Sequence, residues 1–238
     1  MAISISYPPT RPIEYPSSDG LPMAESDFQR KPLTYAVEAL DLYFQDRPDV
    51  YVSGNLFIYY EEGNPEAVVA PDVFVVFGAP KRDRSTYLLW HEPKVPDFVL
   101  EITSRSTRSK DQGAKRGIYA FLGVREYVQY DPTQDYLTPP LKGSQLVGDN
   151  YEALPLTALS DGTLVLHSTV LGLDLRLDHG ALRFVDPVSG QPLLTYREAE
   201  LARRAAEERA RQEAMARAAA EARIAELEAQ LWALQSQG

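Results

Sequence analysis

The chain has 238 residues, of which 44% are hydrophobic, with no cysteine and a formal net charge of −10. This composition supports a packed core and excludes disulfides and thiolate metal sites. The low pI, near 4.9, argues against a protein that coats nucleic acid non-specifically. We find no apolar run long enough to span a membrane and no pattern of a secretory signal, so we expect a cytoplasmic protein.

The first hundred residues predict an extended arm, a helix and three strands. Residues 1–32 are rich in proline and poor in apolar positions, which favours an extended arm. Thr34 can cap a helix that ends near Gln45. β-Branched and aromatic residues predict strands at residues 49–60, 73–77 and 98–103. The first of these should bend at the Ser53–Gly54 pair, and the second is apolar on both faces, as in the centre of a sheet.

The next segment predicts a helix followed by several strands. The helix should extend from residue 110 to 122, because Gly123 follows it in the position where a glycine commonly ends a helix. Residues 126–130 (EYVQY) predict a strand. Short apolar runs alternate with turns from residue 135 to 187, which indicates hairpins at a β-rich edge of the same domain.

The composition changes at about residue 194. The rest of the chain is dominated by Ala, Glu, Arg, Leu and Gln and has no proline, which predicts a long C-terminal helix. Four apolar residues alternate at spacings of three and four, as in a coiled-coil seam: Ile224, Leu227, Leu231 and Leu234. Arg203 and Arg217 share the register of Ile224, so the seam is short. We expect a homodimer through this seam, and a long solvated helix is the alternative.

The predicted organisation therefore has three parts. An extended N-terminal arm covers residues 1–32, an α/β domain covers residues 33–194, and the C-terminal helix covers residues 195–238. Alternating strands and helices favour a sheet covered by helices.

Glu101 is the most informative residue, because it lies in a strand that is otherwise apolar. A buried carboxylate is costly unless it meets a partner or a metal. Asp97 lies on the same strand face but about 13 Å away, at roughly 3.3 Å per residue, which is too far for both carboxylates to bind one metal. Asp72 begins the neighbouring apolar strand, and adjacent strands lie about 4.8 Å apart. Asp72 and Glu101 can therefore share Mg²⁺ or Mn²⁺, with the carbonyl of Ile102 as a third ligand.

The helix after Glu101 carries three polar residues on one face. Asp111, Lys115 and Tyr119 are spaced by four residues. If the short loop folds this helix back over the strand, Lys115 points at the carboxylates and can stabilise charge on a phosphate oxygen. Gly113 and Gly117 are unusual inside a helix, and we expect them to permit close approach to the sheet. The alternative is a turn cap at Asp72, an arginine partner for Glu101 and a solvated Asp111–Lys115 pair.

Two basic segments stand out in this acidic chain. The first surrounds the start of the helix and predicts a contact with nucleic-acid phosphates: Arg105, Arg108, Lys110 and Arg116. The second is a loop with Lys81, Arg82 and Arg84, which could also contact phosphates at the mouth of the site. Both are also compatible with ordinary solvated loops.

These residues resemble the bacterial Uma-type family of endonucleases, within the PD-(D/E)xK restriction-endonuclease-like superfamily. The resemblance rests on APDVFVVFG at residues 70–78 and PDFVLEITSRSTRSKDQGAKRGIYAFLGVREYVQYDP at residues 96–132, and it extends loosely over residues 20–190. It implies an α/β fold with a mixed sheet flanked by helices, and it implies that Asp72 and Glu101 are the acidic metal ligands.

The superfamily pattern differs from this chain at one position. It implies a lysine two residues after Glu101, where this sequence has Thr103. Lys115 on the following helix is the natural substitute, with Tyr119 supporting it. Glu38 on the first helix matches a position where some superfamily members carry another acidic ligand.

Three functional hypotheses follow. The first is a Mg²⁺- or Mn²⁺-dependent nuclease that hydrolyses DNA, with Asp72, Glu101 and Lys115 as catalytic residues. The second is a catalytically inactive nuclease fold that acts as an interaction module through its C-terminal helix. The third is a nuclease that needs a partner protein to bind DNA.

Overall fold

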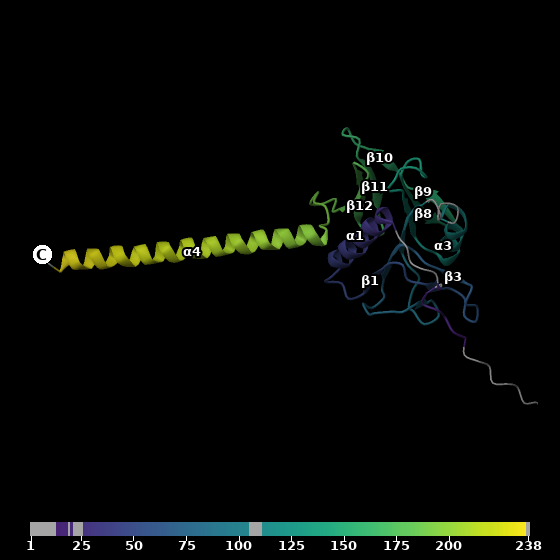
Figure 1. Cartoon of the computed structure of the whole chain (residues 1–238), viewed down its shortest axis with the longest axis horizontal. Coiled ribbons are helices and arrows are strands. Elements are labelled where there is room, and N and C mark those ends of the chain that lie inside the picture. Colours follow the sequence, from purple (N-terminus) through teal and green to yellow (C-terminus); the bar gives the residue numbers. More distant parts are fainter. Residues whose placement is uncertain (1–12, 19, 21–25, 105–110, 237–238) are drawn as a thin grey trace, which may run out of the picture. The chain divides into compact units, whose positions relative to one another are not determined.

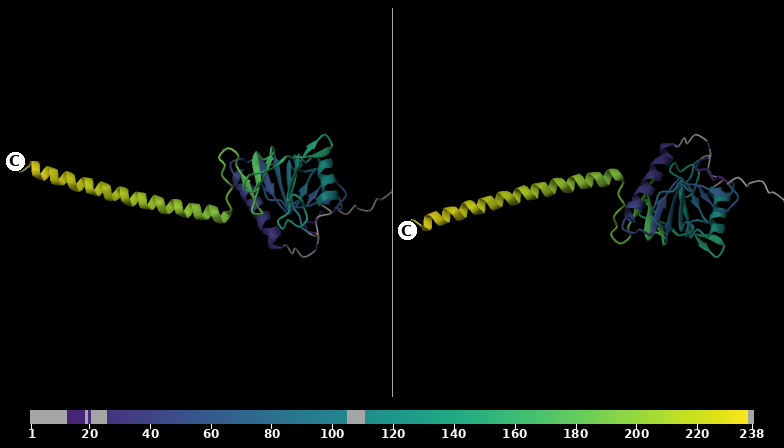
Figure 2. Two further views of the ribbon diagram at one scale, coloured as in Figure 1. Left: turned by 90° about the horizontal axis from the view of Figure 1, so that it is seen from above. Right: turned by 90° about the horizontal axis from the view of Figure 1, so that it is seen from below.

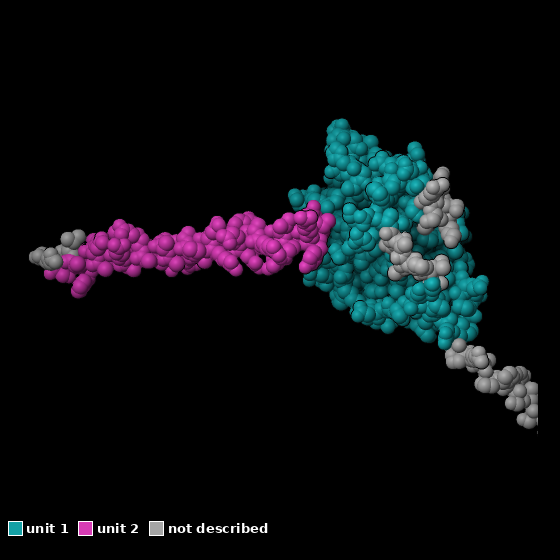
Figure 3. All heavy atoms as spheres, in the orientation of Figure 1, with its two compact units in different colours: residues 1–193 teal, residues 194–238 magenta. Residues whose placement is uncertain are grey.

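The computed structural model describes residues 13–18, 20, 26–104 and 111–236, apart from the side chains of residues 111, 112 and 234. The chain forms two compact units, residues 1–193 and residues 194–238 (Figure 3). The first unit is an α/β domain and the second consists mainly of one helix.

A six-stranded sheet forms the centre of the α/β domain (Figure 1). In spatial order its strands are β1 (Val50–Ser53), β4 (Val73–Phe77), β6 (Phe98–Ile102), β7 (Glu126–Tyr130), β8 (Leu141–Val147) and β9 (Asn150–Ala153). Strands β6 and β7 are parallel, and the other neighbouring strands are antiparallel. The predicted mixed sheet is therefore confirmed.

Two smaller sheets complete the domain. One contains β2 (Ile58–Tyr59), β3 (Val68–Val69) and β5 (Tyr87–Leu88). The other is antiparallel and contains β10 (Leu156–Ala158), β11 (Leu164–Ser168), β12 (Leu173–Asp178) and β13 (Ala181–Val185). The hairpins predicted between residues 135 and 187 are present, but they divide between the central sheet and this second sheet.

The strand predicted at residues 49–60 is wrong as a single element, because β1 and β2 belong to different sheets. The chain leaves the central sheet at Gly54, where a Cβ atom would lie 2.3 Å from the carbonyl oxygen of Asp72. Asn55 then adopts a positive φ of 50° and donates its N–H to the carbonyl of Pro71. The close approach at Gly54 therefore positions the segment that leads into β4.

The two faces of the central sheet have different coverings (Figure 2). On one face, α1 (Asp27–Tyr43) and the second sheet pack over residues such as Val73, Phe98 and Leu100. On the other face, a π-helical turn, η1 (Asp111–Lys115), leads into α3 (Arg116–Leu122), whose Tyr119 packs near Val99 and Tyr127. The alternation of side chains along β6 thus sends Val99 and Glu101 toward α3.

Helix α1 begins earlier than predicted. It starts at Asp27 rather than near Thr34, so residues 27–32 are helical and the extended arm is shorter than residues 1–32. Pro32 lies inside the helix. Its missing N–H removes one hydrogen bond to the carbonyl of Phe28, which lies in the first turn, so the helix continues through it. The composition of the arm concealed this turn.

The helix predicted from residue 110 to 122 is present from Asp111, and Gly123 ends it with a φ of 82°. The expected role of Gly113 and Gly117 is wrong. Both are exposed, and a Cβ atom at either position would meet nothing within 4 Å. Their cost to helix stability is not offset by a close approach to the sheet.

The second unit contains α4 (Tyr196–Gln235), a helix of 40 residues. Its start is capped reciprocally: Thr195 accepts the N–H of Glu198 at 3.1 Å, and Glu198 accepts the N–H of Thr195 at 2.8 Å. Arginine–glutamate pairs, including Arg203–Glu200 and Arg217–Glu221, follow its surface. Within the described part of the chain, no helix combines the length and apolarity that a membrane span requires.

Asp131 organises the turn that ends β7. Its buried carboxylate accepts backbone N–H groups from Thr133, Gln134, Tyr136 and Leu137 at 2.5–3.1 Å. Burial alone would raise the pKa of Asp131, but these bonds, led by those from Tyr136 and Leu137, lower it below its usual value. The ionised carboxylate therefore stabilises the turn.

We expect Asp131→Asn to lower the free energy of unfolding at pH 7 by about 2 kcal/mol, because a neutral amide offers one acceptor oxygen instead of two. Since folding lowers the pKa of Asp131, its contribution is complete above the ordinary aspartate pKa of about 4 and disappears as the pH falls below it. Urea denaturation of both proteins between pH 3 and 7 measures the difference. The exposed Asp83→Asn is the control, and an undiminished difference at pH 3 would refute the role of the ionised form.

Candidate active site

Glu101 is completely buried in β6, with 0% of its surface exposed. Both carboxylate oxygens have partners: Tyr119 donates its hydroxyl to Oε1 at 2.6 Å, and Lys115 donates Nζ to Oε2 at 2.8 Å. A buried carboxylate without such partners would be strongly destabilising. The helix after β6 therefore supplies the cation and the hydroxyl that allow Glu101 to stay in the sheet. The predicted approach of Lys115 to Glu101 is therefore present.

Lys115 and Tyr119 hold Glu101 from η1 and α3. The two residues are one helical turn apart, so they reach the same carboxylate. Lys115 Nζ also donates to the carbonyl of Ala70 at 3.2 Å, just before β4. Burial raises the pKa of Tyr119 well above its usual value, and the Glu101 carboxylate raises it further. Tyr119 therefore remains a protonated donor at neutral pH.

Asp72 lies beside Glu101 on the neighbouring strand. The antiparallel register pairs Val73 with Leu100, so one further residue places Asp72 opposite Glu101. Asp72 is half-buried, and its Oδ2 accepts the N–H of Ile102 at 2.6 Å. This bond fixes one oxygen of Asp72 at the end of β6. The structure thus brings together Asp72, Glu101 and Lys115, while the role of the Ile102 carbonyl stays a prediction.

Two supporting residues occupy different surroundings. Thr103 continues β6 by donating its N–H to the carbonyl of Tyr130 at 2.7 Å, and it is 1% exposed. Glu38 lies on the exposed side of α1 and lines a hollow with Asp41, Lys81 and Arg82. No group of three or more acidic or histidine residues suited to a metal occurs in the described part of the chain, so Glu38 does not join the two carboxylates there.

Of the predicted phosphate contacts at the start of the helix that follows β6, the structure describes Arg116. Arg105, Arg108, Lys110 and the side chain of Asp111 lie outside the described residues. Arg116 donates to the carbonyl of Tyr151 at 2.9 Å, and its guanidinium lies 5.3 Å from the centre of the Tyr151 ring. Arg116 therefore anchors α3 to β9, and its role in nucleic-acid binding stays a prediction.

The second basic segment is neutralised within the chain. Lys81 pairs with Asp41 at 3.0 Å. Arg82 and Arg84 both bind Glu92, and Arg84 does so through two bonds of 2.9 Å while its guanidinium packs 4.1 Å from the centre of the Tyr51 ring. This loop is therefore a structural ion-pair cluster rather than a row of free cations.

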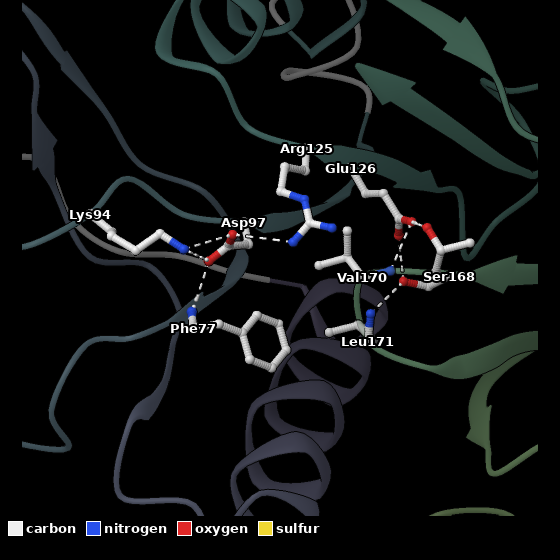
Figure 4. A network of polar contacts seen from close by, with 9 residues as sticks. Phe77, Lys94, Asp97, Arg125, Glu126, Ser168, Val170 and Leu171 are labelled. Atoms are coloured by element: carbon white, nitrogen blue, oxygen red, sulfur yellow. Dashed lines mark hydrogen bonds and ion pairs between the residues drawn. The ribbon is translucent and has the colours of Figure 1, made fainter. Parts of the chain in front are cut away.

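Two further buried carboxylates have structural partners (Figure 4). Asp97 accepts the N–H of Phe77 at 2.8 Å and binds Lys94 at 3.2 Å, at the end of β6 remote from Glu101. Glu126 accepts the hydroxyl groups of Ser168 and Thr169 and the N–H of Val170. These bonds tie β6 to β4 and β7 to the loop after β11, so neither residue belongs to the Asp72–Glu101 cluster.

Gln129 is a site residue that the sequence analysis missed. It lies on β7, where the parallel register with β6 pairs it with Glu101. On its other side, the antiparallel register with β8 pairs it with Lys142. It is 8% exposed, and its Nε2 has no hydrogen-bond partner among the described residues. A glutamine within the strand EYVQY was the visible signal. The pairing of Gln129 with Glu101 could not be predicted from the local sequence, because a helix separates β6 from β7 in the chain.

The two carboxylates suit a divalent cation in donor type and placement. Asp72 and Glu101 face the same side of adjacent strands and offer oxygen ligands, which hard cations such as Mg²⁺ prefer. Oε1 and Oε2 of Glu101 accept bonds from Tyr119 and Lys115, and Oδ2 of Asp72 accepts the N–H of Ile102, so these bonds orient both carboxylates. The nearby ammonium is compatible with a phosphate beside the cation.

The α/β domain thus has a mixed sheet flanked by helices, with Asp72, Glu101 and Lys115 close together at the end of β6. The family model Uma2, described as "Putative restriction endonuclease", matches residues 9–178, and the chain belongs to this family. The crystal structure of "a putative nuclease belonging to DUF820" from Anabaena variabilis is similar, with 13% identity and a TM-score of 0.42. The similarity covers 58% of this chain and 74% of that one. The comparison with curated proteins gives no match.

We expect Lys115→Met to lower the free energy of unfolding by about 2–4 kcal/mol, because it removes the cation from a buried carboxylate. The double variant Glu101→Gln, Lys115→Met should recover part of this loss, since it buries no unpaired charge. Chemical denaturation measures both. Lys31→Met is the control, because its pair with Asp27 is exposed on both sides (side chains 72% and 66% exposed), and it should cost under about 1 kcal/mol. If the double variant is no more stable than Lys115→Met, Glu101 is not held by this pair.

Proposed function

We propose that the chain hydrolyses phosphodiester bonds in DNA with the help of Mg²⁺ or Mn²⁺. The observation that carries the proposal is the cluster at the end of β4 and β6, where Asp72 lies opposite a buried Glu101 and Lys115 Nζ lies 2.8 Å from Glu101. Two carboxylates that can hold a divalent cation, with an ammonium beside them, suit metal-assisted phosphodiester hydrolysis. Membership of the Uma2 family supports the nuclease class.

Asp72 and Glu101 are the residues that would hold the cation. A bound divalent cation supplies Lewis-acid chemistry, which favours ionisation of water and stabilises negative charge on a phosphate. The bond from Ile102 N–H orients Asp72, and the bond from Tyr119 orients Glu101, so the carboxylates are preorganised by the protein.

Lys115 has a separate task in this proposal. Its ammonium is anchored by Glu101 and by the carbonyl of Ala70, and its side chain is 19% exposed. From this position it stabilises negative charge that develops on a phosphate oxygen. Thr103, at the position implied for the superfamily lysine, carries no charge. The residues Arg105, Arg108, Lys110 and Arg116 are the proposed contacts to the DNA backbone.

We expect the purified chain to cut plasmid or single-stranded DNA with Mg²⁺ or Mn²⁺ and to lose at least about a hundredfold in rate as Glu101→Gln or Asp72→Asn, because each change removes an anionic ligand. Asp83→Asn is the matched control, remote in role from the site. Isothermal titration with Mn²⁺ is run on the same proteins.

The outcomes separate the rival functions. Cleavage that persists in Glu101→Gln would refute the assignment of the site. Absence of both cleavage and Glu101-dependent Mn²⁺ binding would favour the second hypothesis, an inactive nuclease fold that works through its C-terminal helix. Cleavage that appears only with an added protein fraction would favour a nuclease that depends on a partner.

We also propose that α4 pairs with a second copy of itself. Three apolar residues of the predicted seam are exposed on this helix: Ile224 at 56%, Leu227 at 43% and Leu231 at 57%. Their spacing places them on one stripe, as in a two-stranded coiled coil. The side chain of Leu234, the fourth seam residue, lies outside the described part. The exposed apolar stripe favours an identical partner because it is complementary to itself.

Sedimentation equilibrium tests this pairing. The chain of 26.6 kDa should show twice that mass, and Leu227→Lys combined with Leu231→Lys should reduce it to the monomer, because like charges then meet in the seam. Met215→Lys is the control, since Met215 is 73% exposed and lies outside the seam. An unchanged mass in the double variant would exclude a dimer through this stripe.

A further inference from the structure

Two buried polar atoms near Glu101 lack hydrogen bonds. Nε2 of Gln129 and Oγ1 of Thr103 have no partner in the part of the chain that the structure describes, although Gln129 is 8% exposed and Thr103 is 1% exposed. A buried polar group without a partner costs about 1–3 kcal/mol, and most proteins avoid it. Such atoms in the interior call for a partner that arrives from outside.

Both side chains lie on the face of the sheet that carries Glu101. Thr103 follows Glu101 by two residues, so alternation points it to the same face. Gln129 is the register partner of Glu101 on the parallel strand β7, about 4.8 Å away. Packing supports this assignment, because Val99, four residues before Thr103, and Tyr127, two residues before Gln129, share one core cluster with Tyr119.

The two strands beside Glu101 place different side chains next to it. Asp72 lies on the β4 side and carries negative charge, whereas Gln129 lies on the β7 side and offers amide hydrogens. The oxygens of Glu101 already accept bonds from Tyr119 and Lys115. The free amide and hydroxyl are therefore placed to serve a different acceptor beside Glu101.

Chemistry identifies the acceptor as an anionic oxygen. Amide and hydroxyl donors bind a charged oxygen with about twice the strength of a neutral one. Both donors lie on the face of the sheet where Lys115 Nζ meets Glu101. An apolar side chain would fill the same space at lower cost if Gln129 served packing alone.

We propose that Gln129 and Thr103 bind a non-bridging oxygen of the substrate phosphate, beside Glu101. The inference rests on the proposed nuclease function and names two substrate contacts within it. Lys142, the register partner of Gln129 on β8, extends the same row toward the next strand. The phosphate backbone would then lie across β6 and β7, with Asp72 toward β4 and with Gln129 and Lys142 toward β8.

The test compares Gln129→Met and Thr103→Val with the parent chain. Each variant keeps the approximate shape and removes the polar atom. We expect KM for cleavage of a duplex oligonucleotide with Mg²⁺ to rise about ten- to hundredfold, as for a lost bond to a charged group. The thermal unfolding midpoint should stay the same or rise, since an unpaired buried group disappears. Gln145→Met, at an exposed glutamine of β8, is the control and should change neither quantity.

A second measurement does not depend on cleavage. The side-chain amide signals of Gln129 are followed by nuclear magnetic resonance while the metal-free chain is titrated with inorganic phosphate and, separately, with the oligonucleotide. We expect these signals to shift and those of Gln145 to stay unchanged.

The results distinguish this inference from the proposed function. If the parent cuts DNA but Gln129→Met has the parental KM, the inference is wrong and the nuclease stands. A Gln129→Met variant that loses stability and activity together shows an internal partner for the amide and also overturns it. If the parent cuts nothing, the proposed function fails. The amide signals then decide the inference, which survives only if phosphate shifts them.

Discussion

The buried charge of Glu101 is the constraint on which this structure depends. A carboxylate with 0% exposure in the middle of a sheet must be neutralised, and the cation and hydroxyl that do so come from the helix that follows it. The helix can reach Glu101 only when it lies against the Val99 face of β6. Docking of η1 and α3 and burial of the Glu101 carboxylate are therefore coupled, because an undocked helix would leave that carboxylate buried without Lys115 and Tyr119.

Topology explains how two chemically different environments coexist in one sheet. Strands β6 and β7 are parallel, so a crossover must connect them, and η1 and α3 form this crossover on one face. The opposite face is covered by α1 and the second sheet and is apolar, with Leu100 and Ile102 facing it. The polar cluster is confined to the crossover face, where the helix supplies its donors. Alternate side chains of β6 therefore face the apolar core and the polar cluster.

Local patterns in the sequence predicted much of the site, and longer-range geometry accounts for what they missed. Glu101 was visible as a charge in an apolar strand, and Lys115 and Tyr119 as a helical pair. Gln129 was not, because its neighbour is set by the register between strands that a helix separates. The pairing of Arg82 and Arg84 with Glu92 was also missed, because Glu92 lies beyond the intervening strand β5. At Gly54, contact with the Asp72 carbonyl divided a segment whose composition predicted one strand.

The position of the lysine gives the site its particular character. A lysine on β6 would be held near Glu101 by the strand itself. Lys115 lies on η1, so it contacts Glu101 only when η1 packs against the sheet. Its second bond, to the carbonyl of Ala70, ties that element to the segment before Asp72. One ammonium therefore connects the crossover helix with both carboxylate-bearing strands. Thr103, two residues after Glu101 on the same strand face, carries a neutral hydroxyl, so Lys115 is the cation that the following helix brings to Glu101.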